Sequence, residues 1–297
     1  MEEGRRTGGG QAGAGRETAV TAAAETVDAL ARAFAALPRP RVRALHLPPS
    51  PWNGSKDAEF AALELDDGAL GLSYVLLDGA LAALHGAGRG GGVVGVDALE
   101  LARAWPQGEG VQRTLGFAAA HALTRSLFDR AGYAPPEATD SIGGLDPQPG
   151  EHVGMVGFFP PLVKQVTARG ARLTVLELRA ELAGDRAGFR ITLDAAELEG
   201  CDKVLLTSTV LLNDTLDAVL ARCACARALA MIGPGAGVLP DALFARGVTL
   251  MGGAWVVDAA GFCRALAAGE PWGRFARKSA LPRDAYPGVD ALAARLR

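Results

Sequence analysis

The fold is decided by residues 152–161, which read HVGMVGFFPP. The short apolar run His152–Val156 predicts a buried strand, and Gly157 then permits a tight turn. The proline pair that follows suits the first turn of a helix, where the missing N–H would have no partner anyway. We therefore expect a strand, a turn and a helix over Pro161–Arg169.

The same alternation continues toward the C-terminus. Strands that alternate with helical segments favour a parallel sheet with right-handed crossovers, so we predict an α/β fold for residues 151–297. The further elements expected are strands at Arg172–Leu178, Lys203–Leu206, Ala226–Ile232 and Val248–Met251, and helices at Asn213–Arg222 and Pro240–Arg246.

The N-terminal half has a different pattern of predicted helices and strands. Apolar residues at helical spacing from Glu17 to Leu37 predict an amphipathic helix, and the Asp- and Gly-rich turn at 66–68 predicts an antiparallel hairpin. Helical patterns at Asp97–Ala104 and Gly110–Arg130 complete an α+β domain over residues 16–131. We expect a flexible leader at 1–15 and a Pro- and Gly-rich domain linker at 132–150.

The composition limits the partners. With 49% hydrophobic residues, a net charge of −3 and a pI near 5.9, the chain has a core but no basic field for nucleic acid. It has no apolar run long enough for a membrane span and no signal-peptide pattern, so we expect a cytoplasmic protein with no membrane partner. Its four cysteines are too few for a disulfide framework, and we expect reduced thiols.

In an open parallel sheet, ligands bind outside the carboxyl ends of the strands, so the segments after each strand carry the site prediction. These segments hold glycine turns, three consecutive hydroxyls and a carboxylate, which suit an anion or a hydrated metal ion. The predicted ligand-binding residues are Gly157, Phe158, Glu177, Thr207, Ser208, Thr209, Asn213, Gly233, Pro234, Gly235 and Gly252.

Each of these features also has a purely structural explanation. The glycines fit tight turns, Glu177 fits a solvated strand end, and Asn213 or Asp214 fits a helix N-cap. Glu177 also lies where an acidic residue of a dinucleotide fold would meet a ribose, so that contact stays open. The full G-x-G-x-x-G motif is absent, however, and Phe158 and Phe159 would obstruct a pyrophosphate, which disfavours a dinucleotide.

His121 is the candidate catalytic residue. Its titratable ring stands among alanines in the predicted helix Gly110–Arg130, and a packed core histidine is the structural alternative. No paired His or Cys metal motif and no G-x-S-x-G elbow occurs, so the sequence names no metal ligands and no hydrolase triad. Cys223 and Cys225 lie two apart late in a predicted helix and face different directions.

Five blocks in order resemble the putative heavy-metal chelation family: VGMVGFFPPLV at 153–163, VLEL at 175–178, LLTSTVLLNDTL at 205–216, IGPGAGVLPDALFARGV at 232–248, and the glycine pair at 252–253. The motifs GLSY at 71–74 and GFAAAHAL at 116–123 resemble the family's N-terminal blocks. The resemblance implies a Rossmann-like C-terminal domain behind an enolase N-terminal-like domain, with a ligand cleft between them.

The resemblance also implies a role. We expect binding or handling of a metal ion or a metal-chelating small molecule, with a divalent or heavy-metal ion as the cofactor; a homo-oligomer is compatible with this. The chain departs from the family pattern at His121, where asparagine is usual, and at Ser208, where glycine is usual. Its ligand can therefore differ from that of typical family members.

Two further functions stay open. One is an enzyme that acts on a small anionic metabolite or nucleotide-like ligand in the same cleft, with residues 233–237 holding the anion, His121 as general acid or base, and Glu177 as its orienter. The other is a two-domain scaffold with a vestigial cleft.

Overall fold

The computed structural model describes residues 20–140, 142, 144–213 and 215–296, so the predicted leader at 1–15 lies outside the described residues. The N-terminal half contains a three-stranded antiparallel sheet in the order β1-β2-β3. The predicted hairpin is β2–β3. The elements of this half are α1 (Ala22–Ala33), β1 (Val42–His46), β2 (Phe60–Leu65), β3 (Leu70–Tyr74), α2 (Ala80–Gly86), α3 (Ala98–Ala102), α4 (Ala104–Gln107) and α5 (Gly110–Arg130).

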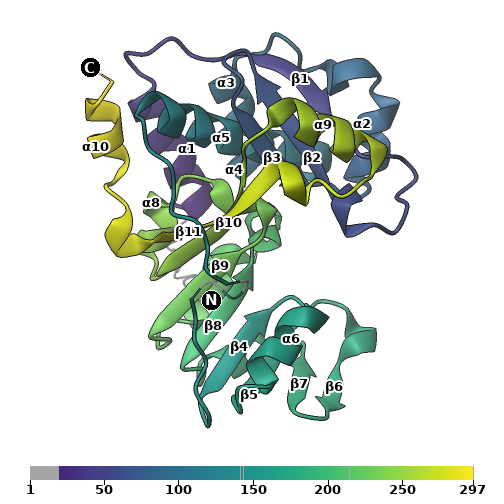
Figure 1. The fold of residues 1–297 in the computed structure, drawn as a ribbon, viewed down its shortest axis with the longest axis vertical. Helices are drawn as coiled ribbons and strands as arrows, with labels where there is room; N and C mark the ends of the chain where they lie inside the picture. The colour runs from purple at the N-terminus through teal and green to yellow at the C-terminus, as the bar shows by residue number, and fades with distance from the viewer. Residues whose placement is uncertain (1–19, 141, 143, 214, 297) are drawn as a thin grey trace, which may run out of the picture.

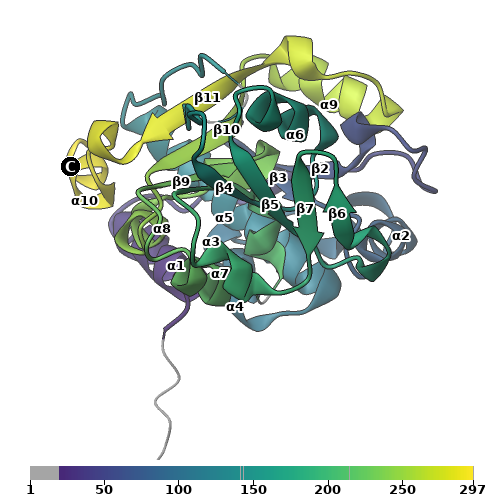
Figure 2. The same cartoon turned by 90° about the horizontal axis from the view of Figure 1, so that it is seen from below.

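The C-terminal half forms an eight-stranded sheet in the order β11-β10-β9-β8-β4-β5-β7-β6. All neighbours from β10 to β7 pair in parallel, whereas β11 and β6 are antiparallel edges, which confirms the α/β class with a parallel sheet. The strands are β4 (His152–Val156), β5 (Arg172–Leu176), β6 (Gly184–Arg186), β7 (Phe189–Thr192), β8 (Lys203–Thr207), β9 (Ala228–Ile232), β10 (Leu250–Val256) and β11 (Ala276–Pro282). Figure 2 shows their labels running from β6 at one edge to β11 at the other.

The described residues of the C-terminal half also form five helices: α6 (Pro160–Thr167), α7 (Leu216–Arg222), α8 (Asp241–Ala245), α9 (Ala259–Ala268) and α10 (Val289–Ala294). The helix predicted at Asn213–Arg222 is wrong at its start. Thr207 Oγ1 accepts the Thr209 N–H and turns the chain into a 3-10 segment at Ser208–Leu212, so α7 begins only at Leu216. Within the described part of the chain, every helix is too short or too polar to cross a membrane.

Alternate side chains of the strands enter two apolar layers. Val153, Met155 and Leu205 pack with α6 on one face of the sheet. Val204 and Leu206 point to the other face, into a core that also contains Leu123 and Leu127 of α5. The long helix α5 of the N-terminal half therefore shares an apolar core with the C-terminal sheet.

The two halves are interleaved as well as adjacent. Figure 1 shows α9, in yellow-green, among the purple and blue elements of the N-terminal half, and α9 contacts both β1 and β2. Phe262 and Leu266 of α9 share a core cluster with Phe60 and Leu72 of the small sheet. Conversely, α1 contacts α8 and α10. The division into domains 16–131 and 151–297 stays a prediction, and the contacts across it are extensive.

The described residues of the segment 132–150 contain no helix and no strand. Part of it nevertheless runs along β11, because Ala138 donates its N–H to the Lys278 oxygen and Ala280 donates to the Pro136 oxygen. Glu137 forms an isolated bridge with Ser279. This segment therefore acts as a wall beside the sheet edge.

Candidate functional site

The order of the parallel strands reverses between β4 and β8, since β5 and β7 follow β4 on one side and β9 and β10 follow β8 on the other. Ligands in such sheets bind at this reversal, outside the carboxyl ends of the strands. Gly157 follows β4 there, and a Cβ on it would lie 3.2 Å from Thr207 Cγ2. The structure thus brings these two predicted residues together.

The hydroxyl groups of Thr207 and Thr209 hydrogen-bond each other. Thr207 Oγ1 lies 3.1 Å from Thr209 Oγ1 and caps the following turn. Ser208 is only 4% exposed, and its Oγ would lie 2.4 Å from a Cβ on Gly233 and 3.3 Å from one on Gly235. Ser208 therefore packs beneath the glycine loop.

The glycine loop 233–237 needs its first glycine for conformational reasons. Gly233 has φ +132°, which side-chain-bearing residues rarely adopt. Its N–H donates to the Gly252 oxygen, and the Ala236 N–H donates back to the Gly233 oxygen, each at 2.9 Å. Two of the amides that a backbone anion nest would use are thus already committed.

Glu177 is tied to its own surroundings. Its carboxylate accepts hydrogen bonds from the backbone N–H groups of Phe158, Leu178 and Arg179 and from the Arg179 guanidinium. Burial alone would raise the pKa of Glu177, but these hydrogen bonds and the Arg179 charge outweigh it, and the pKa lies below its ordinary value. The carboxylate is therefore ionised and holds the loops after β4 and β5 together.

The N-cap explanation of Asn213 is wrong. The residue before α7 is Thr215, and Asn213 Oδ1 instead accepts hydrogen bonds from the Thr215 N–H and hydroxyl. The 3-10 segment that precedes it shifts the helix start beyond the reach of a cap at 213. Asn213 is a turn residue in this structure.

His121 is buried at the contact between the halves. Its ring is 4% exposed, and Nδ1 lies 3.1 Å from both the backbone nitrogen and the backbone oxygen of Leu72. Nε2 would lie 2.4 Å from a Cβ on Gly237, so the glycine loop packs directly on the ring. Burial, partly offset by the Leu72 hydrogen bond, lowers the pKa of His121 to about 4.

A small cavity of about 30 Å³ lies beside this ring, lined by α5, β3, β10 and β11. Arg125 closes it by donating to the Val256 oxygen and stacking 3.8 Å from the centre of the Trp255 ring. A space of this size holds about one water molecule. His121 therefore faces a small internal cavity and hydrogen-bonds the backbone of Leu72.

A much larger pocket, of about 410 Å³, opens at the carboxyl ends of β9 and β10. The glycine loop, both strands of the β10–β11 pair and the 132–150 segment form its walls. Of the predicted ligand-binding residues, Gly233, Pro234 and Gly252 line it, and the others do not. The remaining lining residues are Asp57, Ala138, Asp140, Ile232, Gly253, Ala254, Trp272, Gly273, Ala276, Arg277, Lys278, Ser279 and Ala280.

Arg277 is the most informative group in this pocket. Its Nη2 donates to the Pro135 oxygen at 2.7 Å. Its Nη1 is buried and has no hydrogen-bond partner among the described residues. Leaving a buried neutral donor without a hydrogen bond costs about 1–3 kcal/mol of stability, and a charged donor costs more. An anion that accepts a hydrogen bond from Nη1 would therefore be favoured.

Sequence reasoning missed Arg277, Asp57 and Asp140 because none belongs to a recognisable motif. Asp57 lies at this pocket because the Trp272 Nε1–H donates a hydrogen bond to its backbone oxygen at 3.1 Å. This contact joins segments that are far apart in the chain. The proline-rich segment before β4 was one available signal, since a linker between parallel-sheet and α+β regions commonly borders a ligand site. The four cysteines are free, and Cys225 is the exposed one.

Comparison with known proteins finds one family model that matches part of the chain. Residues 141–283 match the family model described as putative heavy-metal chelation. No curated protein matches the chain significantly. A solved structure of a protein of unknown function from this family in Desulfitobacterium hafniense is similar, with 19% identity, 87% of this chain and 98% of that chain covered, and a TM-score of 0.65.

A second family member of unknown function, from Pyrococcus horikoshii, gives 18% identity, coverage of 88% and 100%, and a TM-score of 0.64. At these identities the two structures establish the fold alone.

Proposed function

We propose that the protein binds an anionic metal-chelating small molecule, and with it a metal ion; the match of residues 141–283 to the family model described as putative heavy-metal chelation supports this. The ligand would occupy the 410 Å³ pocket between the halves. The observation that carries this proposal is the buried Arg277 Nη1, which has no hydrogen-bond partner among the described residues.

The lining of the pocket fits a carboxylate chelate. A planar guanidinium recognises a carboxylate through hydrogen bonds from its N–H groups. The Pro135 oxygen accepts from one end of the Arg277 guanidinium, and a small side-chain rotation would turn the other, buried end toward a ligand in the pocket. Asp57 and Asp140 line the same pocket, and hard cations accept carboxylate oxygens as ligands. Asp140 Oδ1 already accepts the N–H groups of Ile142 and Gly144, so Oδ2 would be its metal-binding atom. A chelate that carries both negative carboxylates and a cation therefore finds a complementary charge for each.

The position of His121 argues against its predicted acid–base role in this pocket. An enzyme at this site would need a general acid or base within hydrogen-bond reach of its ligand. His121 is outside the lining of the large pocket and hydrogen-bonds Leu72. The acid–base role therefore has no support from its surroundings.

The finer description of the fold belongs to the same proposal. The strand order β7-β5-β4-β8-β9-β10 is the order of doubly wound dinucleotide-binding sheets, which supports a Rossmann-like C-terminal domain. The antiparallel β1-β2-β3 sheet backed by α5 supports the enolase N-terminal-like assignment of residues 16–131.

Titration calorimetry on the full chain tests the proposal, with citrate and nitrilotriacetate as polycarboxylate probes, each alone and with Zn²⁺. We expect at least one probe to bind the parent, and Arg277→Gln to weaken that binding about tenfold or more, because it removes a charge-assisted hydrogen bond. Arg274→Gln is the matched control, since Arg274 stacks on Phe275 and does not line the pocket.

The proposal is wrong if neither probe binds the parent. It is equally wrong if Arg277→Gln, with a melting temperature like that of the parent, binds the probes as tightly as Arg274→Gln does.

A further inference from the structure

Two strands of the small sheet place an imidazole and a carboxylate on one face. Glu64 of β2 pairs with Ala44 and His46 of β1 pairs with Ala62, so the two side chains are diagonal neighbours. His46 Nε2 lies 2.8 Å from Glu64 Oε2. Both side chains are partly buried, with exposures of 26% and 19%.

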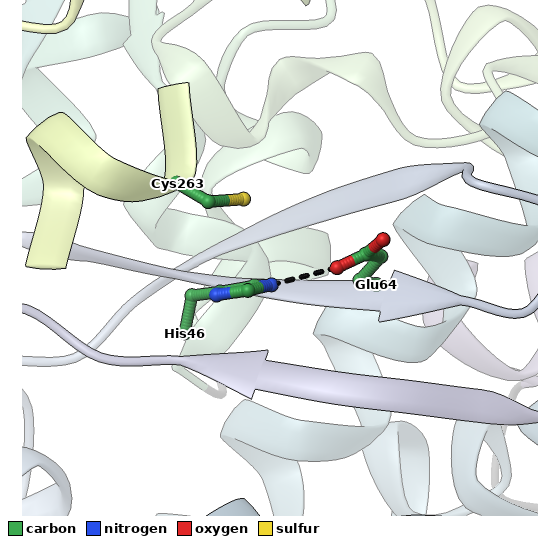
Figure 3. A group of neighbouring side chains, drawn as sticks. All are labelled: His46, Glu64 and Cys263. Carbon is green, nitrogen blue, oxygen red and sulfur yellow. Dashed lines mark hydrogen bonds and ion pairs between the residues drawn. The ribbon is translucent and has the colours of Figure 1, made fainter. Parts of the chain in front are cut away.

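The helix α9 brings a thiol to the same place. Ala62 lies two residues before Glu64 in β2, on the same face of the sheet. Ala62 belongs, with Phe262 and Cys263, to the apolar cluster that packs α9 on this sheet. Figure 3 shows Cys263 projecting from its helix over the strands that carry the other two residues. Its Sγ, His46 Nε2 or Nδ1, and a Glu64 carboxylate oxygen all lie within 4.8 Å of one another.

We propose that His46, Glu64 and Cys263 form a binding site for a soft divalent metal ion such as Zn²⁺ or Cd²⁺. Imidazole, carboxylate and thiolate are established ligands of Zn²⁺, with metal–ligand bonds of about 2.0–2.3 Å. The three donor atoms, which lie within 4.8 Å of one another, would therefore have to move slightly closer together to bind one ion. Small side-chain rotations would close the site. The fourth position would hold water or an exogenous ligand, as in sites with three protein ligands.

The donor set also selects among metals. Thiolate and imidazole favour Zn²⁺ and softer ions over Ca²⁺ and Mg²⁺, which prefer oxygen alone. On binding, the His46–Glu64 contact would be exchanged for two bonds to the metal, and the Cys263 thiol would release its proton to solvent as the metal–sulfur bond forms. The Arg43 guanidinium, 3.4 Å from the other carboxylate oxygen, would remain as a second contact of Glu64.

This site is independent of the chelate pocket. None of its three residues lines that pocket. The ligands come from β1, β2 and α9, so they form no paired-ligand motif in the sequence. A protein with both features would hold a metal at one place and a metal chelate at another.

Cd²⁺ titration of the metal-free full chain tests the site, with the ultraviolet absorption of a cadmium–thiolate bond as the readout. We expect saturation at one Cd²⁺ per chain. Cys263→Ala should abolish the absorption, and His46→Gln and Glu64→Gln should each weaken Cd²⁺ binding about tenfold or more while retaining the thiolate band at high Cd²⁺. His46→Gln alters a partly exposed position, so it tests the site even if the Cys263 variant folds poorly.

Two controls separate this site from others. Cys225→Ser removes the exposed thiol and should leave the Cd²⁺ titration unchanged, as should Arg277→Gln, so failure of the chelate proposal would not affect it. The proposal is overturned if the thiolate band is absent from the parent or survives Cys263→Ala. It is also overturned if Cys225→Ser removes the band, or if both His46→Gln and Glu64→Gln bind Cd²⁺ like the parent.

Discussion

Replacing Gly71 by alanine is expected to lower the free energy of unfolding by about 3 kcal/mol, the upper end of typical overpacking costs. A Cβ at position 71 would lie 2.1 Å from the Ala118 oxygen and 2.3 Å from the Ala122 nitrogen. These are backbone atoms of α5 and cannot rotate away. The strand β3 would therefore have to separate from the helix on which both halves pack.

Chemical denaturation at neutral pH measures this effect. Gly86→Ala is the matched control, because a Cβ on Gly86 meets no atom within 4 Å and the residue ends a helix. That control should leave stability unchanged or raise it slightly. Equal stability of Gly71→Ala and the parent would show that β3 and α5 are not in close contact.

The second large effect concerns pH. The pKa of His121 is about 4 in the folded protein, against 6.5 for an ordinary histidine, because burial disfavours the charged ring. Between these values the unfolded chain binds a proton that the folded chain excludes. The stability is therefore fully present above pH 6.5 and is lost as the pH falls toward 4, by about 3 kcal/mol for this residue alone.

His121→Asn removes this titration and keeps a polar side chain. We expect its free energy of unfolding to fall about 3 kcal/mol less than that of the parent between pH 7 and pH 4. His85→Asn, which removes an exposed imidazole, controls for the loss of one histidine. If the His121 variant and the parent lose the same stability on acidification, the ring is not held neutral by burial.

Elements with local signals were predictable from the sequence. The helix Gly110–Arg130 has the bounds expected from its pattern, since no proline interrupts it and helix bonds are local. The β2–β3 hairpin follows from the Asp-Asp-Gly turn, and the strand-to-helix step at Gly157 follows from the prolines that open α6. The parallel sheet followed from the alternation of these elements.

Elements that depend on distant partners were not predictable. The edge strands β6 and β11 are short or irregular in pattern, and their pairing is decided by the neighbouring strand. Packing of α9 on the N-terminal sheet joins segments from opposite ends of the chain, which no window of sequence reports. The helix start at Leu216 was missed because a threonine side chain capped an earlier turn.

The candidate site shows the same limit. The rule that ligands bind at carboxyl strand ends led to Gly157 and Thr207, which lie together, and to Gly233 and Gly252, which border the pocket; their role in binding stays a prediction. Arg277 lies on an antiparallel edge strand outside that rule. Its importance follows from burial without a partner, which is a property of the packed structure.

A crystal structure of the full chain with the bound polycarboxylate and its metal tests the central claim most directly. The account predicts a carboxylate of the ligand within hydrogen-bond distance of Arg277 Nη1, inside the pocket bordered by Gly233 and Gly252. A ligand bound elsewhere, with Arg277 Nη1 bonded only to protein or water, would contradict it.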